Sequence, residues 1–222
     1  MTASGPTAPA SSRSVQIGLR RGANPLGGLR RPALMSRATL RPGIPRRLLT
    51  DRLLLRPLRR EDTAPYIRMY TDRKMWSFLP AGVWKKGGRK SIQAWRKRNR
   101  AKKAYHFIIR TRSDRAFVGE IAIHSINWGS RHGELGYHIE RSQWGRGYAT
   151  EAAAVVVRWG FERAKLHRLD ADVSEGNAAS LRVLRRLGFR REGRRPERTL
   201  LGTRWVAELE YGLLAGEYRR GR

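Results

Sequence analysis

Cysteine is absent from the 222 residues of this chain. Its absence excludes a disulfide framework, a thiol nucleophile and any zinc or iron–sulfur site with cysteine ligands. The five histidines are scattered and none forms an i, i+4 pair, so we predict no metal site. Long apolar runs are missing too: none approaches the roughly 20 residues that a membrane-spanning helix requires, and we predict no membrane span.

Acidic residues are scarce. The chain has 48 Lys+Arg against 18 Asp+Glu, a formal net charge of +30, and only 8 of the basic residues are lysine. A charge of this size predicts an acidic partner, such as nucleic acid, the ribosome, an anionic membrane surface or a phosphorylated cofactor. The alternative is that an arginine bias of the genome leaves a solvated surface without a function.

Residues 1–50 contain neither an acid nor a lysine and are rich in Ser, Gly, Pro and Ala. Such a segment cannot bury enough apolar surface to offset its ordering entropy, so we predict a disordered basic extension. Three interpretations stay open: an arm that binds nucleic acid or the ribosome, an organelle transit peptide, or a dispensable extension with Met35 as the true start. Because the apolar core of a secretory signal is missing, we expect a cytoplasmic protein, with one domain over 51–216 and a basic tail over 217–222.

From residue 52 onward the pattern is that of a folded domain. Strands are predicted over 52–58, 105–110, 116–126, 133–139, 168–173, 189–193 and 203–213. Helices are predicted over 61–70, 84–103, 147–165 and 177–187. A run of consecutive strands, followed by alternating helices and strands, indicates a mixed α/β or α+β sheet.

The most basic stretch of the domain is 84–103, which holds ten basic residues and no acid. Ile92 and Trp95 give this predicted helix one thin apolar face. The rest is either a solvated helix face or, with Trp84 and Trp95 interleaved among the cations, a contact for RNA or the ribosome.

A loop of sequence QWGRGYAT, residues 143–150, follows a predicted strand and opens the longest predicted helix. Gly145 and Gly147 allow a sharp turn and a close approach of a ligand to the backbone. The unpaired amides and the dipole of the helix start make an anion site suited to a pyrophosphate. The loop lacks both the dinucleotide-binding and the P-loop glycine patterns. An ordinary tight loop with a helix cap is the alternative.

Further motifs accompany this loop: LLLRPL near the start of the domain, GELGYHI, LHRLDADV and NAASLRVLRRLGFRREG. Together they make residues 52–215 resemble the GNAT superfamily of acetyl-CoA-dependent N-acetyltransferases. Within it, the chain is similar to the RimJ/RimL type, which acetylates the N-termini of ribosomal proteins. The resemblance implies the GNAT fold, a mostly antiparallel twisted central sheet with a splayed strand pair, flanked by helices.

The resemblance also implies the residues that bind acetyl-CoA. Those of the pyrophosphate loop are Gln143, Trp144, Gly145, Arg146, Gly147, Tyr148, Ala149 and Thr150. The backbone that holds the pantetheine arm corresponds to Tyr137, His138, Ile139 and Glu140. Asn177 falls on a position near the thiol end, although helix capping alone would also explain it.

The family mechanism is direct attack of an amine on the thioester, which needs neither a covalent enzyme intermediate nor a cysteine. The resemblance implies that Glu134 is the general base, acting through water, and that Ser180 protonates or hydrogen-bonds the departing sulfur. A carboxylate paired with arginine and an ordinary first-turn serine are the alternatives. Glu197 and Glu120 are further candidates for the base.

The acceptor is expected to lie against two loops, residues 75–90, with Trp76, Phe78 and Trp84, and residues 197–205. Their basic rim favours a ribosome-bound or nucleic-acid-associated acceptor or an acidic peptide, and disfavours polyamines and aminoglycosides. We therefore predict acetylation of a protein N-terminal amine, with ribosome or RNA association through the basic extension and 84–103. The alternatives are acetylation of a small amine or antibiotic, and a ribosome- or RNA-binding protein with weak catalysis. The sequence leaves monomer and homodimer open.

Overall fold

The chain divides into two compact units, Met1–Met35 and Ser36–Arg222. A computed structural model describes residues 41–72, 74–75 and 89–220, which all belong to the second unit. None of the helices in this described part is long and apolar enough to cross a membrane.

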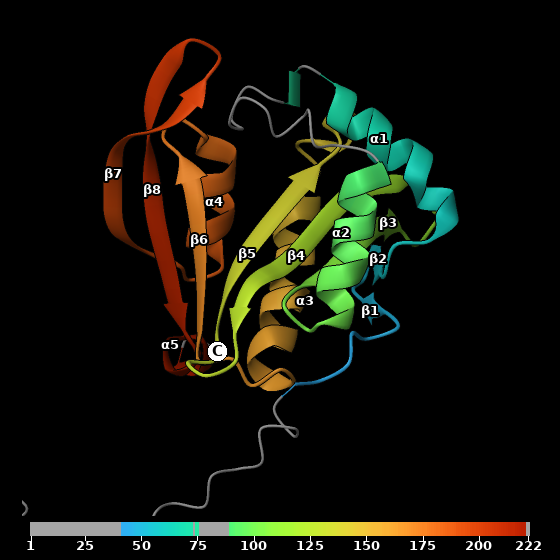
Figure 1. Ribbon diagram of the computed structural model, residues 1–222, viewed down its shortest axis with the longest axis horizontal. Helices are drawn as coiled ribbons and strands as arrows, with labels where there is room; N and C mark the ends of the chain where they lie inside the picture. Colours follow the sequence, from blue (N-terminus) through green and yellow to red (C-terminus); the bar gives the residue numbers. More distant parts are fainter. Residues whose placement is uncertain (1–40, 73, 76–88, 221–222) are drawn as a thin grey trace, which may run out of the picture. The chain divides into compact units, whose positions relative to one another are not determined.

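Eight strands of the described residues form one sheet (Figure 1). In spatial order they are β1 (Leu48–Leu49), β2 (Leu53–Arg56), β3 (Tyr105–Thr111), β4 (Phe117–Asn127), β5 (His132–Ile139), β6 (Arg168–Ser174), β8 (Arg204–Leu214) and β7 (Arg190–Leu201). Neighbouring strands are antiparallel, except that β5 and β6 run parallel. We call β6, β8 and β7 the C-terminal arm of the sheet.

Helices cover both faces of the sheet (Figure 1). They are α1 (Thr63–Thr71), α2 (Arg89–Arg100), α3 (Tyr148–Glu162), α4 (Ala178–Arg186) and α5 (Ala215–Arg220), with short 3-10 turns at Arg60–Asp62 and Arg141–Gln143. We call the face covered by α1 and α2 the front, and the face covered by α3 and α4 the rear. The larger hydrophobic core lies at the rear and the smaller one lies under α1 and α2. The predicted mixed, mostly antiparallel fold flanked by helices is confirmed.

The front helix α2 has a thin apolar face. Ile92 and Trp95 of α2 are buried, and its residues from 93 to 100 are otherwise exposed or half-buried, as the sequence predicted. Trp95 stacks on His106 of β3, with ring centroids 4.4 Å apart. The basic side chains of α2 whose burial is described therefore lie in solvent.

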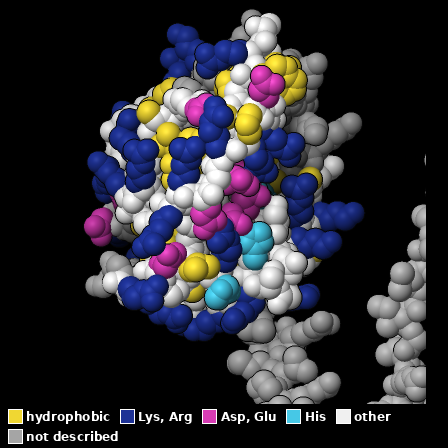
Figure 2. All heavy atoms as spheres, turned by 90° about the vertical axis from the view of Figure 1, so that its left-hand side faces the viewer, with side chains coloured by type: hydrophobic (Ala, Val, Ile, Leu, Met, Phe, Trp, Pro, Cys, Tyr) yellow, Lys and Arg dark blue, Asp and Glu magenta, His cyan; other side chains and the backbone are white. Residues whose placement is uncertain are grey.

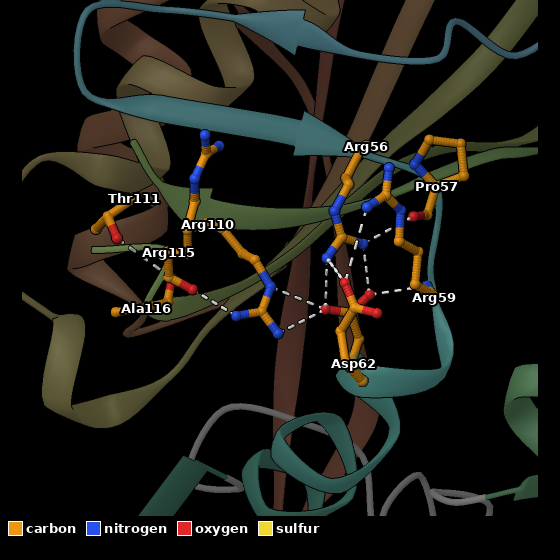
Figure 3. A network of polar contacts seen from close by, with 9 residues as sticks. Arg56, Pro57, Arg59, Asp62, Arg110, Thr111, Arg115 and Ala116 are labelled. Atoms are coloured by element: carbon orange, nitrogen blue, oxygen red, sulfur yellow. Dashed lines mark hydrogen bonds and ion pairs between the residues drawn. The ribbon is translucent and has the colours of Figure 1, made fainter. Parts of the chain in front are cut away.

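The start of α1 is held by a buried ion network (Figure 3). The Asp62 carboxylate, fully buried, accepts hydrogen bonds from Arg56 Nη1 at 2.6 Å and from Arg110 Nη2 at 2.7 Å. The Arg59 backbone N–H donates to the same carboxylate at 2.7 Å. Two guanidinium groups and an amide thus satisfy one carboxylate and join α1 to β2 and β3.

The folded domain begins before residue 51. Leu48 and Leu49 pair with β2, and Leu48 and Ile44 pack against the rear core. The Lys102 ammonium donates to the Arg41 carbonyl at 2.8 Å. The composition of residues 41–50 resembles that of residues 1–40 and predicts that they belong to the extension. Their contacts, which are long-range, place them in the domain instead.

The C-terminal arm also differs from expectation. The strand predicted over 189–193 continues to Leu201, past Pro196, because β7 lies at the edge of the sheet and carries two register shifts. An edge strand accommodates a proline that lacks a ladder hydrogen bond. The expected boundary after residue 216 falls inside α5, whose Tyr218 ring packs 5.2 Å from Phe161 of α3.

Candidate functional site

Strands β5 and β6 separate after a short parallel ladder. They pair at only three positions, and the last of these joins Glu134 to Asp170. Beyond it β5 pairs only with β4, and β6 only with β8, so the two strands diverge toward the start of α3 (Figure 1). The edges of β5 and β6 that face each other above Glu134 carry backbone groups without a strand partner, which is a place for an extended ligand.

The loop between β5 and α3 leaves its amides unpaired. The backbone N–H groups of residues 145–150 make no hydrogen bond within the described residues. Gly145 and Gly147 have φ of +75° and +78°, which only glycine adopts readily. A Cβ added at Gly145 would meet nothing within 4 Å, so the loop is open where a ligand would approach. Unpaired amides, a helix N-terminus and open space fit the diphosphate of a coenzyme.

The other residues predicted for this loop surround the turn. Gln143 ends the 3-10 turn, and its backbone N–H donates to the Glu140 carbonyl at 2.8 Å. Trp144 is 49% exposed, and its indole N–H donates to the Ile139 carbonyl at 2.8 Å. That bond occupies one β5 carbonyl at the end of the strand, so Ile139 is less free for a ligand than the sequence suggested.

Three predicted residues meet on the rear face of the gap. Asn177 caps α4, and its side-chain oxygen accepts from the Ser180 amide at 3.1 Å. Burial raises the pKa of the Tyr137 phenol to about 12, and the Ser180 hydroxyl partly opposes this shift. The phenol oxygen is buried and forms no hydrogen bond of good geometry among the described residues, so Ser180 is a near neighbour of the phenol rather than a bonded partner. A hydroxyl and a phenol therefore stand together where β6 leads into α4.

The front face of the gap is acidic. A cavity of about 220 Å³ begins at Glu134 and extends over the strands of the C-terminal arm. We call this cavity the acidic pocket; its lining residues are His132, Glu134, Arg168, Asp170, Asp172, Glu192, Arg195, Glu210 and Tyr211. Carboxylates outnumber guanidinium groups in it, although the chain as a whole is strongly basic. Figure 2 shows acidic side chains gathered beside a histidine and surrounded by Lys and Arg.

The proximity of these carboxylates changes their titration. Burial raises the pKa of Glu134, and the charges of Asp172 and Asp170 raise it further. The pKa of Glu208, on β8 outside the pocket lining, is also raised by burial and by Asp172. Arg195 offsets part of this repulsion through contacts of 2.6 Å to Asp172 and 3.1 Å to Glu210. The pocket thus keeps an excess of negative charge after its internal ion pairs are formed.

A second polar cluster lies on the front face beside the gap. Glu120 of β4 is buried and lies 2.8 Å from His138 Nδ1, directly across the ladder. The Tyr70 hydroxyl of α1 donates to the same carboxylate and lies 3.1 Å from His138 Nδ1. The family resemblance implies a role for the backbone of His138 and none for its side chain. The alternation of β5 signals its side chain, because it shares a face with Glu134.

Glu197 is not part of this arrangement. It sits exposed at a register shift of β7, with φ of +47°, and makes none of the described hydrogen bonds or ion pairs. Of the expected acceptor loops, residues 197–205 form the β7–β8 hairpin. Trp76, Phe78 and Trp84 lie outside the described residues. No group of His, Asp and Glu side chains in the described ranges is arranged to hold a metal ion.

The sequence and the fold are similar to those of known proteins. Residues 52–190 match the family described as acetyltransferase (GNAT) domain. The chain is 28% identical over 171 residues to the uncharacterized N-acetyltransferase YnaD of Bacillus subtilis, covering 77% of this chain and 98% of that protein. It is 24% identical over 190 residues to the [ribosomal protein uS5]-alanine N-acetyltransferase of Escherichia coli, covering 82% and 98%.

Solved structures share the architecture. Mycobacterium smegmatis RimJ in complex with CoA-disulfide superposes with a TM-score of 0.68 at 28% identity, covering 74% of this chain and 83% of that one. A spermidine N-acetyltransferase from Vibrio cholerae, in complex with CoA and spermine, superposes with a TM-score of 0.67 at 19% identity, covering 77% and 99%. The latter likeness concerns the fold alone.

Proposed function

The chain belongs to the GNAT acetyltransferase family, and from this premise we propose that it acetylates the N-terminal amine of a protein whose following residues are basic. The observation that carries the acceptor class is the acidic pocket beside Glu134. An ammonium group and neighbouring basic side chains complement its excess of carboxylates. Low-identity likeness to the uS5-alanine enzyme supports a ribosomal protein as the acceptor.

The unpaired amides of residues 145–150 and the free edges of β5 and β6 are the groups that would hold acetyl-CoA. When bound, acetyl-CoA supplies the acetyl group as an activated thioester. The protein's own contribution is to position the two substrates, to hold the amine on the front face and to exchange protons on both faces.

Glu134 is proposed to accept the proton of the acceptor ammonium, directly or through water. It occupies the last paired position before the strands separate, and it faces the pocket. Burial and the neighbouring aspartates raise its pKa, which makes the carboxylate a better proton acceptor than an ordinary glutamate. His124 Nδ1 lies 3.5 Å from the Glu134 carboxylate. The Glu134 side chain nevertheless remains 33% exposed and is accessible to an acceptor.

Ser180 is proposed to donate a hydrogen bond or a proton to the sulfur. It lies on the rear side of the gap, near the buried phenol of Tyr137, whereas Glu134 lies on the front side. Proton removal and proton donation are thereby assigned to opposite faces of β5. The amine can then approach from one face while the sulfur departs toward the other.

A small polycation is the second candidate acceptor, and the acidic pocket favours it as well. The sequence predicted repulsion of polyamines from the basic loops at the rim. The pocket next to Glu134 instead carries an excess of negative charge, which attracts them. Charge alone therefore does not separate a basic peptide from a polyamine, and the acceptor panel below includes both.

The test measures coenzyme A release by the full chain with acetyl-CoA and four acceptors. These are an alanine peptide followed by arginines, the same peptide with glutamates in place of arginines, the arginine peptide with a blocked N-terminus, and spermidine. We expect turnover with the free arginine peptide and at least about tenfold lower kcat/KM with the glutamate peptide. Turnover confined to spermidine, or retained by the blocked peptide, would contradict acetylation of a protein N-terminus.

A further inference from the structure

We propose that Arg52 is a positioning residue for acetyl-CoA, although it lies more than ninety residues upstream of the loop that would bind the diphosphate. The residue precedes β2, at the side of α3. From there its guanidinium reaches the first turn of α3 and the loop before it. This inference concerns the cofactor side of the site and is independent of the acceptor.

The contacts of Arg52 use the whole guanidinium group. Its Nε donates to Glu151 Oε2 at 2.7 Å, and its Nη2 lies 2.6 Å from the same oxygen. Its Nη1 donates to the Arg146 carbonyl at 3.1 Å. The guanidinium also lies over the Tyr148 ring, 4.8 Å from its centroid. One side chain therefore contacts the loop backbone, the first helical residue and the first-turn carboxylate.

The backbone of the same segment adds to this attachment. The Arg52 amide donates to Glu151 Oε1 at 3.0 Å, and the Thr50 hydroxyl donates to that oxygen as well. A carboxylate that accepts this many hydrogen bonds stays ionised: burial alone would raise the pKa of Glu151, but Thr50 and Arg52 together lower it. Glu151 is thus a permanent negative charge within the first turn of α3.

The negative charge of Glu151 would oppose the binding of an anion at the start of α3. The unpaired amides of residues 145–150 attract an anion, while a bare carboxylate one turn into the helix would repel a diphosphate. Arg52 neutralises Glu151 and at the same time holds the Arg146 carbonyl. A carbonyl held by Arg52 is kept from turning toward the anion, and the amides of Gly145 and Gly147 stay presented. Both effects predict tighter binding of acetyl-CoA.

The experiment is isothermal calorimetry of the full chain with acetyl-CoA. We expect Arg52→Ala to raise the Kd at least tenfold. Arg52→Lys keeps the charge but cannot span both Glu151 and the Arg146 carbonyl, so it should fall between wild type and Arg52→Ala. The double variant Arg52→Ala/Glu151→Gln should recover part of the affinity, because it removes the uncovered charge without restoring the tether.

Arg190→Ala is the matched control. Arg190 also forms an ion pair, 3.3 Å from Glu217 of α5, at the end of the sheet away from the start of α3 (Figure 1). Its removal costs one positive charge and should change the Kd less than twofold. A Kd of Arg52→Ala within twofold of wild type overturns the proposal. A double variant as weak as Arg52→Ala overturns the charge argument, and an Arg52→Lys protein with wild-type affinity overturns the tether.

Discussion

From β1 to β5 the most buried carboxylates are matched by donors, whereas in the acidic pocket over the C-terminal arm carboxylates outnumber the guanidinium groups. Asp62, fully buried, accepts from two arginines and an amide, and Glu120 accepts from Tyr70 and contacts His138. In the arm, Arg195 is shared by Asp172, Glu208 and Glu210. The matched groups stabilise the fold, and the unmatched ones leave an excess of negative charge in the pocket.

The boundary between these two halves is the proposed site. Three parallel residue pairs connect β5 to β6, compared with seven registered pairs between β6 and β8. A sheet that is well paired on either side of a short ladder opens at that ladder. The gap thereby exposes backbone groups without unfolding either half.

The largest expected effect comes from filling the loop between β5 and α3 with side chains. Replacing Gly145 and Gly147 by Val places β-branched side chains at positive φ, in the space that a diphosphate needs. Calorimetry should show a loss of acetyl-CoA affinity of about 100-fold or more, since the backbone can no longer present its amides. Gly202→Val is the control, because its φ of +62° gives similar strain at the hairpin tip. Unchanged affinity in a folded Gly145/Gly147 variant would contradict the cofactor assignment.

Removing a carboxylate from the buried ion network of Asp62 should lower the stability of the fold rather than the activity. Asp62→Asn leaves two arginines short of a carboxylate, and we expect about 3 kcal/mol lower stability in urea unfolding. Asp172→Asn in the arm should cost less than about 1 kcal/mol, because its ion pair is partly exposed. Equal losses in the two variants would remove the contrast between the halves.

The Asp62 contribution has a defined pH dependence. Burial would raise its pKa, but hydrogen bonds from Arg56, Arg59 and Arg110 lower it below the ordinary 3.8. A depressed folded pKa gives stability that is present above 3.8 and is lost as pH falls toward the folded value. The stability difference between wild type and Asp62→Asn should therefore shrink in that acidic range.

Removing the proposed base should cost activity rather than stability. Glu134→Gln is expected to lower kcat about 100-fold with an unchanged Kd for acetyl-CoA. Wild-type activity should fall with decreasing pH at a higher pH than for an ordinary glutamate, because the pKa of Glu134 is raised. A raised folded pKa stabilises the fold only at low pH, so the variant should unfold no earlier at neutral pH. Glu192→Gln, in the same pocket, should retain kcat; equal losses in both would contradict a specific role for Glu134.

The smallest effect is expected on the rear face. Ser180→Ala keeps the amide that donates to Asn177, so the cap of α4 survives. We expect kcat to fall about tenfold and the KM for acetyl-CoA to stay constant, as for a group that acts in the transition state. Asn177→Ala is the contrasting variant, with about 1 kcal/mol lower stability from the lost cap. A Ser180→Ala enzyme with wild-type kcat would remove Ser180 from the mechanism.

Local patterns in the sequence predicted the elements that depend on neighbours along the chain. The glycine loop and the helix after it follow from residue types within one turn, and Ile92 and Trp95 follow from helical spacing. The length of β7 and the attachment of residues 41–50 escaped prediction. Both depend on partners far away in the chain, namely β8 and the contacts of Tyr105 and Lys102.

By itself, the sequence determined the family, the order of strands and helices and the position of the glycine-containing loop before α3, because motifs and periodicity are properties of short segments. Only the tertiary structure decided which charges meet. It brought Arg52 to Glu151, His138 to Glu120, and the carboxylates of four strands into one pocket. Electrostatic interactions depend on distance in space, and a composition with a net charge of +30 conceals a local excess of negative charge.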